Sequence, residues 1–119
     1  MMKITGIKGL YFSGTGTTER IVRTLAEELG RHLGAPVRFH DFTVPQAREA
    51  QQSFGAAELA VVGVPVYAGR VPNVLLPYLK EKLRGNGAPA IPVVLFGNRN
   101  FDDGLIELRD LLEAAGMRT

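Results

Sequence analysis

The amino-acid sequence predicts an α/β fold of three layers, in which helices cover both faces of a parallel β-sheet. Apolar segments typical of strands alternate with segments of helical period four times along the chain. Residues 59–66 are almost continuously apolar, as is typical of a central parallel strand that is buried on both faces. Parallel neighbours need crossover connections, and these connections place the helices over the sheet.

The composition limits the kind of domain and the kind of chemistry. The chain has 119 residues, of which 45% are hydrophobic, and we expect one domain over residues 1–119. It contains no cysteine, which excludes disulfides, thiolate nucleophiles and cysteine-ligated metal centres within the chain. Two histidines make a metal site or Ser/His catalysis a weak hypothesis. His40 and Asp41 have no nucleophile nearby in sequence, so we expect a structural or surface role for them.

Charge and hydropathy exclude two classes of partner. The 14 Lys and Arg residues against 12 Asp and Glu residues give a net charge of +2, and they form no basic run. No apolar run approaches the roughly 18–20 residues that span a bilayer, and the N-terminus lacks a signal-peptide core. We therefore expect no nucleic-acid partner, no membrane association and a cytoplasmic location.

The first strand and helix flank a distinctive turn. The predicted strand over residues 7–12 ends in a segment rich in glycine and hydroxyl groups, residues 13–18. After this segment, apolar residues recur at spacings of three and four, which predicts a helix. Thr17 or Thr18 can serve as its N-cap, and Gly34 can end it.

The middle of the chain predicts two more units of strand and helix. Residues 37–42 have the alternating character of a strand, and residues 45–54 predict a short polar helix. Residues 59–66 form the buried strand described above. Pro72 suits the first turn of the next helix, whose apolar stripe extends to Leu83.

The last unit consists of a buried strand over residues 91–96 and a helix whose apolar residues lie between Leu105 and Ala115, with Gly116 at its C-terminus.

Ligands of parallel α/β sheets bind beyond the carboxyl ends of the strands. Three loops from those ends carry distinctive residues, and they span residues 13–18, 65–72 and 97–104.

The first of these loops is a candidate anion site. It places four hydroxyl groups and two glycines at the N-terminus of a helix, where unpaired N–H groups and the helix dipole favour a phosphate. It contains no lysine for a Walker motif, and Glu19 stands where the dinucleotide motif needs its third glycine. Tyr11 stands where a nucleophile elbow needs glycine. The alternative is a hydroxyl-rich turn that only caps the helix.

A family resemblance extends this interpretation. Residues 11–18 resemble the phosphate-binding loop of flavodoxins, a Ser/Thr-x-Thr-Gly-x-Thr run that wraps the monophosphate of FMN. Residues 64–72 and 97–102 are similar to the two loops that flank the flavin in that family. The resemblance implies bound FMN and a set of cofactor-binding residues: Ser13, Gly14, Thr15, Gly16, Thr17, Thr18, Pro65, Val66, Tyr67, Ala68, Gly69, Gly97, Asn98, Arg99, Asn100 and Phe101.

The resemblance also implies roles for the aromatic and basic residues of the second and third loops. It implies that Phe101 stacks on the flavin ring and that Tyr67 contacts the ring from the other loop, unless both are ordinary packing residues. Arg70 and Arg99 lie in the same loops. Positive charge there would favour the anionic reduced flavin, unless both side chains point to solvent.

The resemblance implies an FMN-binding electron-transfer domain rather than a stand-alone enzyme. Its second and third loops resemble those of the flavodoxin domain that precedes ferredoxin-type 4Fe-4S motifs, which implies a redox partner protein, with a ferredoxin-type iron–sulfur domain as one candidate. Three alternatives stay open. They are an FMN-dependent NAD(P)H oxidoreductase acting on a quinone or small acceptor, a flavodoxin of the type that activates ribonucleotide reductase, and a non-redox phosphate-binding module.

The strand count adds one further expectation. A flavodoxin-like sheet has five strands in the order 2-1-3-4-5, whereas this sequence predicts four strands in the order 2-1-3-4. An uncovered fourth strand would present an apolar edge that invites pairing. We therefore expect that the chain is truncated before strand five, or that this edge is covered by a homodimer partner or another chain.

Overall fold

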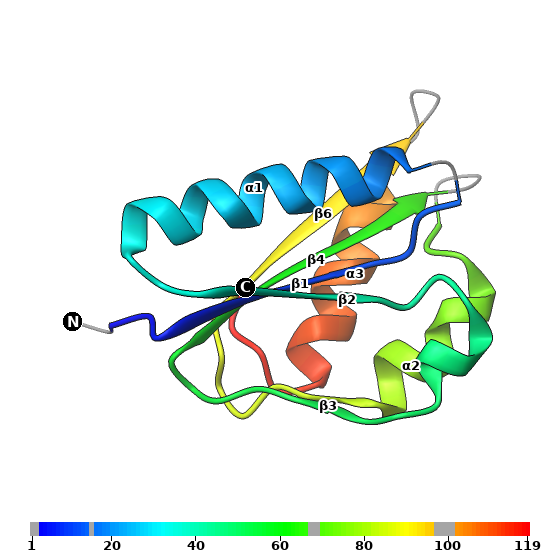
Figure 1. The fold of residues 1–119 in the computed structure, drawn as a ribbon. Helices are drawn as coiled ribbons and strands as arrows, with labels where there is room; N and C mark the ends of the chain where they lie inside the picture. Colours follow the sequence, from blue (N-terminus) through cyan, green and yellow to red (C-terminus); the bar gives the residue numbers. More distant parts are fainter. Residues whose placement is uncertain (1–2, 15, 67–69, 97–101) are drawn as a thin grey trace.

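The computed structural model describes residues 3–14, 16–66, 70–96 and 102–119. One parallel sheet contains the strands β1 (Gly6–Tyr11), β2 (Val37–Asp41), β4 (Glu58–Val66) and β6 (Ala90–Phe96). Their order across the sheet is β2-β1-β4-β6, so the predicted order 2-1-3-4 is confirmed (Figure 1).

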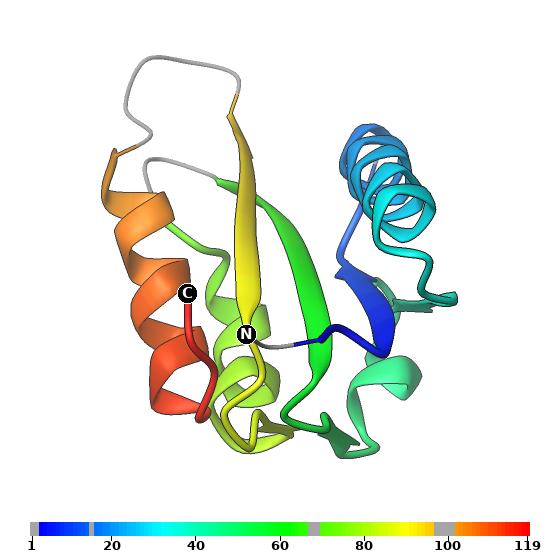
Figure 2. The same cartoon turned by 90° about the vertical axis from the view of Figure 1, so that its left-hand side faces the viewer.

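Helices cover both faces of this sheet, as predicted. The helix α1 (Thr17–Leu33) lies on one face, and α2 (Leu76–Glu81) and α3 (Asp102–Ala114) lie on the other (Figure 2). Gly34 ends α1 in the left-handed conformation with φ 65°, as expected of a C-terminal glycine. None of the helices in the described part of the chain is long and apolar enough to cross a membrane.

Two predicted helical segments are wrong in detail. Residues 45–54 form a 3₁₀ turn, η1 (Pro45–Arg48), and a short strand, β3 (Gln52–Ser53). A second 3₁₀ turn, η2 (Asn73–Leu75), precedes α2, and Leu83 lies in the short strand β5 (Leu83–Arg84).

A long-range contact explains why Gln52, Ser53 and Leu83 are in strands rather than helices. Strands β3 and β5 pair in parallel as a separate two-stranded sheet. The N–H groups of Gln52 and Phe54 donate to the carbonyls of Lys82 and Arg84, at 2.7 and 2.9 Å. Phe54 is thereby buried, at 2% exposure, so tertiary pairing outweighs the weak helical pattern of this segment.

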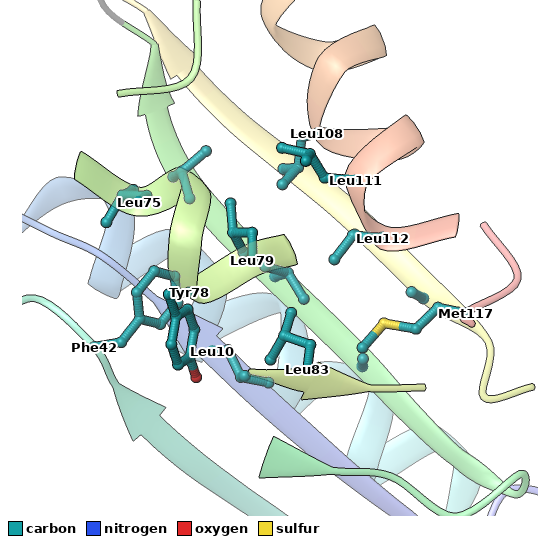
Figure 3. Packing of buried hydrophobic residues seen from close by; sticks show 14 of the residues in the cluster. Leu10, Phe42, Leu75, Tyr78, Leu79, Leu83, Leu108, Leu111, Leu112 and Met117 are labelled. Carbon is teal, nitrogen blue, oxygen red and sulfur yellow. The ribbon is translucent and has the colours of Figure 1, made fainter. Parts of the chain in front are cut away.

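Two apolar clusters hold the layers together. Between the sheet and α2 and α3, the buried side chains include Leu10, Leu79, Leu108 and Leu112 (Figure 3). Between the sheet and α1, the buried side chains include Ile7, Tyr11, Val22, Ala26 and Val61. Each helix therefore buries one face against the sheet, and both faces of β4 lie in the core.

The C-terminal residues lie beside the last strand of the sheet. Arg118 makes an isolated parallel bridge with Pro89. Its N–H donates to the Ala88 carbonyl at 2.8 Å, and its carbonyl accepts the N–H of Ala90 at 2.7 Å. Strand β6 is the last strand of the sheet in the described part of the chain, so the expected fifth strand stays a prediction.

Candidate functional site

The candidate site lies at the edge where the parallel strands end. Because β1, β4 and β6 are parallel, their carboxyl ends meet at one edge of the sheet, and α1 begins at the same edge (Figure 1). The chain reaches α1 from β1 through residues 12–16. The segment after β4 leaves from the same edge and returns to the described part of the chain at Arg70.

Ser13 organises the N-terminus of α1. Its Oγ accepts the N–H of Gly16 at 2.9 Å and the N–H of Glu19 at 3.2 Å. Glu19 is the third residue of the helix, and this N–H is one that an N-cap side chain commonly satisfies. The hydroxyl group of Ser13 therefore lies where helix N–H groups converge, which is the position that favours an anion oxygen.

The backbone of the loop leaves space at this position. Gly16 is the N-cap of α1 and has a φ of 89°, a conformation that glycine adopts without steric cost. A Cβ atom on Gly14 would have no other atom within 4 Å. The prediction that Thr17 or Thr18 caps the helix is therefore wrong, because the turn places Gly16 at the cap and Ser13 supplies the side-chain oxygen.

The two threonines that follow have different surroundings. Thr17 is exposed at the first position of α1. Thr18 is buried, at 4% exposure, and its methyl group lies over Gly63 of β4. The structure thus brings Ser13, Gly14, Gly16, Thr17 and Thr18 to one edge of the sheet. Thr15, the remaining predicted residue of this loop, lies outside the described residues.

Sequence reasoning missed Thr43, which supports the loop from the segment that follows the neighbouring strand β2. The Oγ1 of Thr43 accepts the N–H of Ser13 at 2.9 Å. The Oδ1 of Asp41 in turn accepts the N–H of Thr43 at 2.9 Å and a short hydrogen bond from its hydroxyl group. The available signal was a hydroxyl residue two positions after the end of β2, the strand that pairs with β1.

His40 has a structural role, as expected. Its Nε2 lies 3.0 Å from the carbonyl oxygen of Ala47 in η1. Its ring also stacks near Tyr78, with 6.4 Å between the ring centroids. The His40–Asp41 pair therefore supports the chain that follows β2.

A polar cluster ties α1 to β1 behind the loop. Arg23 donates to Glu19 at 2.9 Å and to the hydroxyl of Tyr11 at 3.0 Å, and its guanidinium lies over the ring of Phe39. Burial raises the pKa of Tyr11 above its ordinary value, although the hydrogen bond from Arg23 opposes the rise. These contacts hold the first turns of α1 against the end of β1.

The described residues at the two ends of the second predicted loop contact α3. Pro65 is half-buried. The Val66 side chain packs against Gly104, so only the backbone of Val66 is available for contact with a cofactor. Arg70, which we expected either beside the flavin or in solvent, forms an ion pair with Glu107 at 2.9 Å. The Glu107 carboxylate therefore offsets the positive charge of Arg70.

The predicted ring contacts lie outside the described residues. These are Tyr67, Ala68 and Gly69 of the second loop, and Gly97, Asn98, Arg99, Asn100 and Phe101 of the third. The structure resumes at Asp102, the first residue of α3.

Comparison with known proteins supports the fold. No protein-family model matches the sequence, and no curated protein sequence matches it. A crystal structure from Bacteroides uniformis, described as a "putative flavoprotein", matches with a TM-score of 0.60 and 16% sequence identity. The match covers 97% of this chain and 87% of the other. Likeness at this identity shows the fold, which is the flavodoxin-like α/β/α fold with its parallel sheet.

Proposed function

We propose that the protein binds FMN at this edge of the sheet and acts as an electron-transfer domain. The observation that carries the proposal is the Ser13 hydroxyl, which accepts N–H groups from Gly16 and Glu19 at the N-terminus of α1. These hydrogen bonds mark where the first N–H groups of α1 converge, and this end of the helix, with the positive end of its dipole, favours negative charge. The structural neighbour, which is described as a "putative flavoprotein", supports a flavin as the ligand.

The described residues fit the phosphate end of FMN. Gly14 and Gly16 leave space for close approach of an anion, and Ser13 and Thr17 supply hydroxyl groups beside it. Thr43 and the Arg23 cluster hold the loop and α1 in place before a ligand arrives. Such preorganisation lowers the entropy lost on binding. We assign the ring contacts to Tyr67 and Phe101, on the basis of the flavodoxin resemblance.

In this proposal the protein supplies binding and orientation, and the flavin supplies the redox chemistry when it is bound. The chain's own residues bind the phosphate and orient the cofactor. A ferredoxin-type iron–sulfur protein or domain is the proposed electron-transfer partner, again on the basis of the resemblance. Slow oxidation of NAD(P)H is expected, whereas rapid turnover with a quinone would favour the oxidoreductase alternative.

Flavin titration tests the proposal. We expect the protein to quench the fluorescence of FMN and to bind it at least about tenfold more tightly than riboflavin, because riboflavin lacks the phosphate. A protein that quenches neither flavin would contradict the proposal. Equal affinity for FMN and riboflavin would contradict the assignment of the phosphate to the Ser13 loop.

A substitution at Gly14 tests the phosphate position directly. Because its Cβ position is open, Gly14→Asp adds a negative charge to the loop without a steric clash. We expect this variant to weaken FMN binding by about tenfold or more, through repulsion of the phosphate, and to leave riboflavin binding unchanged. Gly14→Asn is the matched neutral control, and it should retain most of the FMN affinity.

A further inference from the structure

Thr43 connects the candidate phosphate loop to the segment that follows β2. Strands β1 and β2 lie side by side and end at the same edge of the sheet (Figure 1). The Phe42 N–H donates to the Tyr11 carbonyl at 2.9 Å, which extends their pairing beyond the last residue of β2. Thr43 is the next residue along the chain, and its side chain reaches Ser13 from there.

The hydrogen bonds of Thr43 can run in one direction only. The Asp41 carboxylate is an acceptor, so the short hydrogen bond between it and the Thr43 hydroxyl uses the hydroxyl proton. The Thr43 oxygen is left with its lone pairs, and it accepts the Ser13 N–H at 2.9 Å. Asp41 also accepts the Thr43 N–H at 2.9 Å, so one carboxylate orients both the backbone and the side chain of Thr43.

Thr43 is held by a second side chain, that of Arg48. The Nη1 atom of Arg48 donates to the carbonyls of Phe42 and Thr43, at 2.9 Å each. The guanidinium also lies 5.9 Å from the ring centroid of Phe12, the residue before Ser13. The acceptor that Thr43 presents to Ser13 is therefore fixed by contacts that need no ligand.

This arrangement leaves the hydroxyl proton of Ser13 for a ligand. The Ser13 N–H is bonded to Thr43, and the Ser13 Oγ accepts the N–H groups of Gly16 and Glu19 at 2.9 and 3.2 Å. A hydroxyl group has two lone pairs and one proton, so only the proton is left to bond. No acceptor in the described part of the chain receives it. A Cβ atom on Gly14 would have no other atom within 4 Å, so the loop is open beside Ser13.

We propose that Thr43, oriented by Asp41, is a positioning residue for the phosphate of FMN. It holds the Ser13 backbone where the Ser13 hydroxyl group donates its proton to a phosphate oxygen. This inference rests on the proposed function. Hydrogen bonds to a charged phosphate are the strong ones, and riboflavin has no phosphate. Loss of the Thr43 oxygen should therefore weaken the binding of FMN and leave that of riboflavin unchanged.

Thr43→Val and Thr43→Ser form the test pair, with FMN and riboflavin as the two probes. Valine has a shape similar to that of threonine but no oxygen, so the Ser13 N–H loses its acceptor, whereas serine retains the hydroxyl group. We expect Thr43→Val to weaken FMN binding by about tenfold and Thr43→Ser to retain most of the FMN affinity. Thr24→Val makes the same change at an exposed threonine of α1, and it should bind both flavins like the wild type.

Asp41→Ala and Asp41→Asn test the role of the carboxylate in orienting Thr43. Both variants lack the negative charge of Asp41, but only asparagine retains an oxygen that can accept the Thr43 hydroxyl and N–H groups. We expect FMN to bind about fivefold more weakly to Asp41→Ala than to Asp41→Asn. Equal FMN affinities of these two variants would overturn the role of Asp41, because charge would then be its only effect.

Hydrogen exchange in the protein without flavin tests the contact itself. The Ser13 amide should exchange with solvent at least about tenfold faster in Thr43→Val than in the wild type or Thr43→Ser, whereas amides of α3 should be unchanged. Unchanged Ser13 exchange in Thr43→Val would overturn the inference while the proposed function stood. An unchanged FMN affinity, or equal losses for FMN and riboflavin, would do the same. A wild-type protein that binds neither flavin would overturn both.

Discussion

The Tyr78 hydroxyl group is a buried polar atom without a hydrogen-bond partner among the described residues. The ring itself packs well, since its centroid lies 4.7 Å from that of Phe42 and it belongs to the core beside α2 (Figure 3). Burial raises the pKa of Tyr78 far above its ordinary value, so the group stays neutral. An unpaired hydroxyl in this position costs stability.

We expect Tyr78→Phe to raise the free energy of unfolding by about 1 kcal/mol, because it removes the unpaired oxygen and retains the ring. Urea unfolding monitored by circular dichroism measures this change. Tyr11→Phe is the matched control. It should lower stability by about 0.5–1.5 kcal/mol, because the Tyr11 hydroxyl bonds Glu19 and Arg23. A loss of stability in Tyr78→Phe would show that this hydroxyl has a partner.

Glu107 makes stability depend on pH in the acid range. The hydrogen bonds from Arg70 lower the pKa of Glu107 below its ordinary value of 4.5, although burial opposes this change. A carboxyl group with a lowered folded pKa contributes stability above its unfolded pKa and loses it as the pH falls through the folded pKa.

We therefore expect the stability difference between the wild type and Glu107→Gln to be constant above about pH 5.5 and to shrink as the pH falls below 4.5. Denaturant unfolding at a series of pH values measures this difference. Glu113→Gln, which removes a carboxylate that bonds the Thr119 hydroxyl, serves as the reference. A difference that stays constant down to pH 2 would exclude a stabilising charge on Glu107.

At the scale of elements, the packing of α1 on the sheet depends on Gly63, a residue of β4 that has no side chain. A Cβ atom on Gly63 would lie 2.3 Å from Cγ2 of Val22, which is closer than real atoms approach. Val22 is fully buried and belongs to the cluster between α1 and the sheet. The helix that begins at the candidate phosphate loop is therefore seated by a contact between Val22 and Gly63.

We expect Gly63→Ala to lower the free energy of unfolding by about 1–3 kcal/mol, because it overpacks this contact. Adding Val22→Ala removes the methyl group that the new Cβ meets, so the two losses should be less than additive. Thermal and urea unfolding of the single and double variants measure the coupling. Gly14→Ala, with open space around its Cβ, should change stability by less than about 0.5 kcal/mol. Additive losses at Gly63 and Val22 would contradict the contact.

At the scale of the whole molecule, the outer edge of β6 is protected from pairing with another strand at only a few residues. The Ala88 carbonyl and the Ala90 N–H bond to the backbone of Arg118 on the outer side. The Pro89 carbonyl points the other way and accepts the N–H of Ala60 in β4. Because backbone groups alternate in direction along a strand, Pro92 faces the same outer edge as Ala90. Proline has no N–H group to donate there, and proline on an edge strand opposes pairing with another strand.

Apolar side chains lie beside this edge. A hollow of about 480 Å³ is lined by Pro92, Thr119 and residues of α3 that include Leu105 and Ile106. Leu105 and Ile106 are 39% and 47% exposed. The expectation that a fifth strand, a homodimer partner or another chain covers this edge stays a prediction, and the hollow indicates where such a covering segment would lie.

We expect Pro92→Val to increase self-association, because valine supplies an N–H group and a β-branched side chain at the open edge. Sedimentation velocity over a hundredfold range of concentration measures the change. The matched control is Ile91→Val, because Ile91 points its backbone toward β4. Identical sedimentation of Pro92→Val and the wild type at every concentration would show that this edge is already covered.

The amino-acid sequence by itself determined the main elements and their connection. Apolar runs, helical periodicity and glycine stops are local signals, so the four strands of the main sheet, the long helix α1 and the three-layer arrangement were predicted from them. The Ser13 loop was also recognisable, because its hydroxyl groups and glycines are contiguous in sequence.

Only the tertiary structure decided the contacts between distant residues. The Ser13–Thr43 bond, the β3–β5 pair and the anchoring of Val71 by Glu107 join residues about 30 or more positions apart. No local pattern specifies such pairs, because they depend on which elements the sheet order places side by side. For the same reason the prediction of a helix over residues 45–54 is wrong. Its weak helical pattern yields to a strand pairing and a buried Phe54 that the folded chain alone provides.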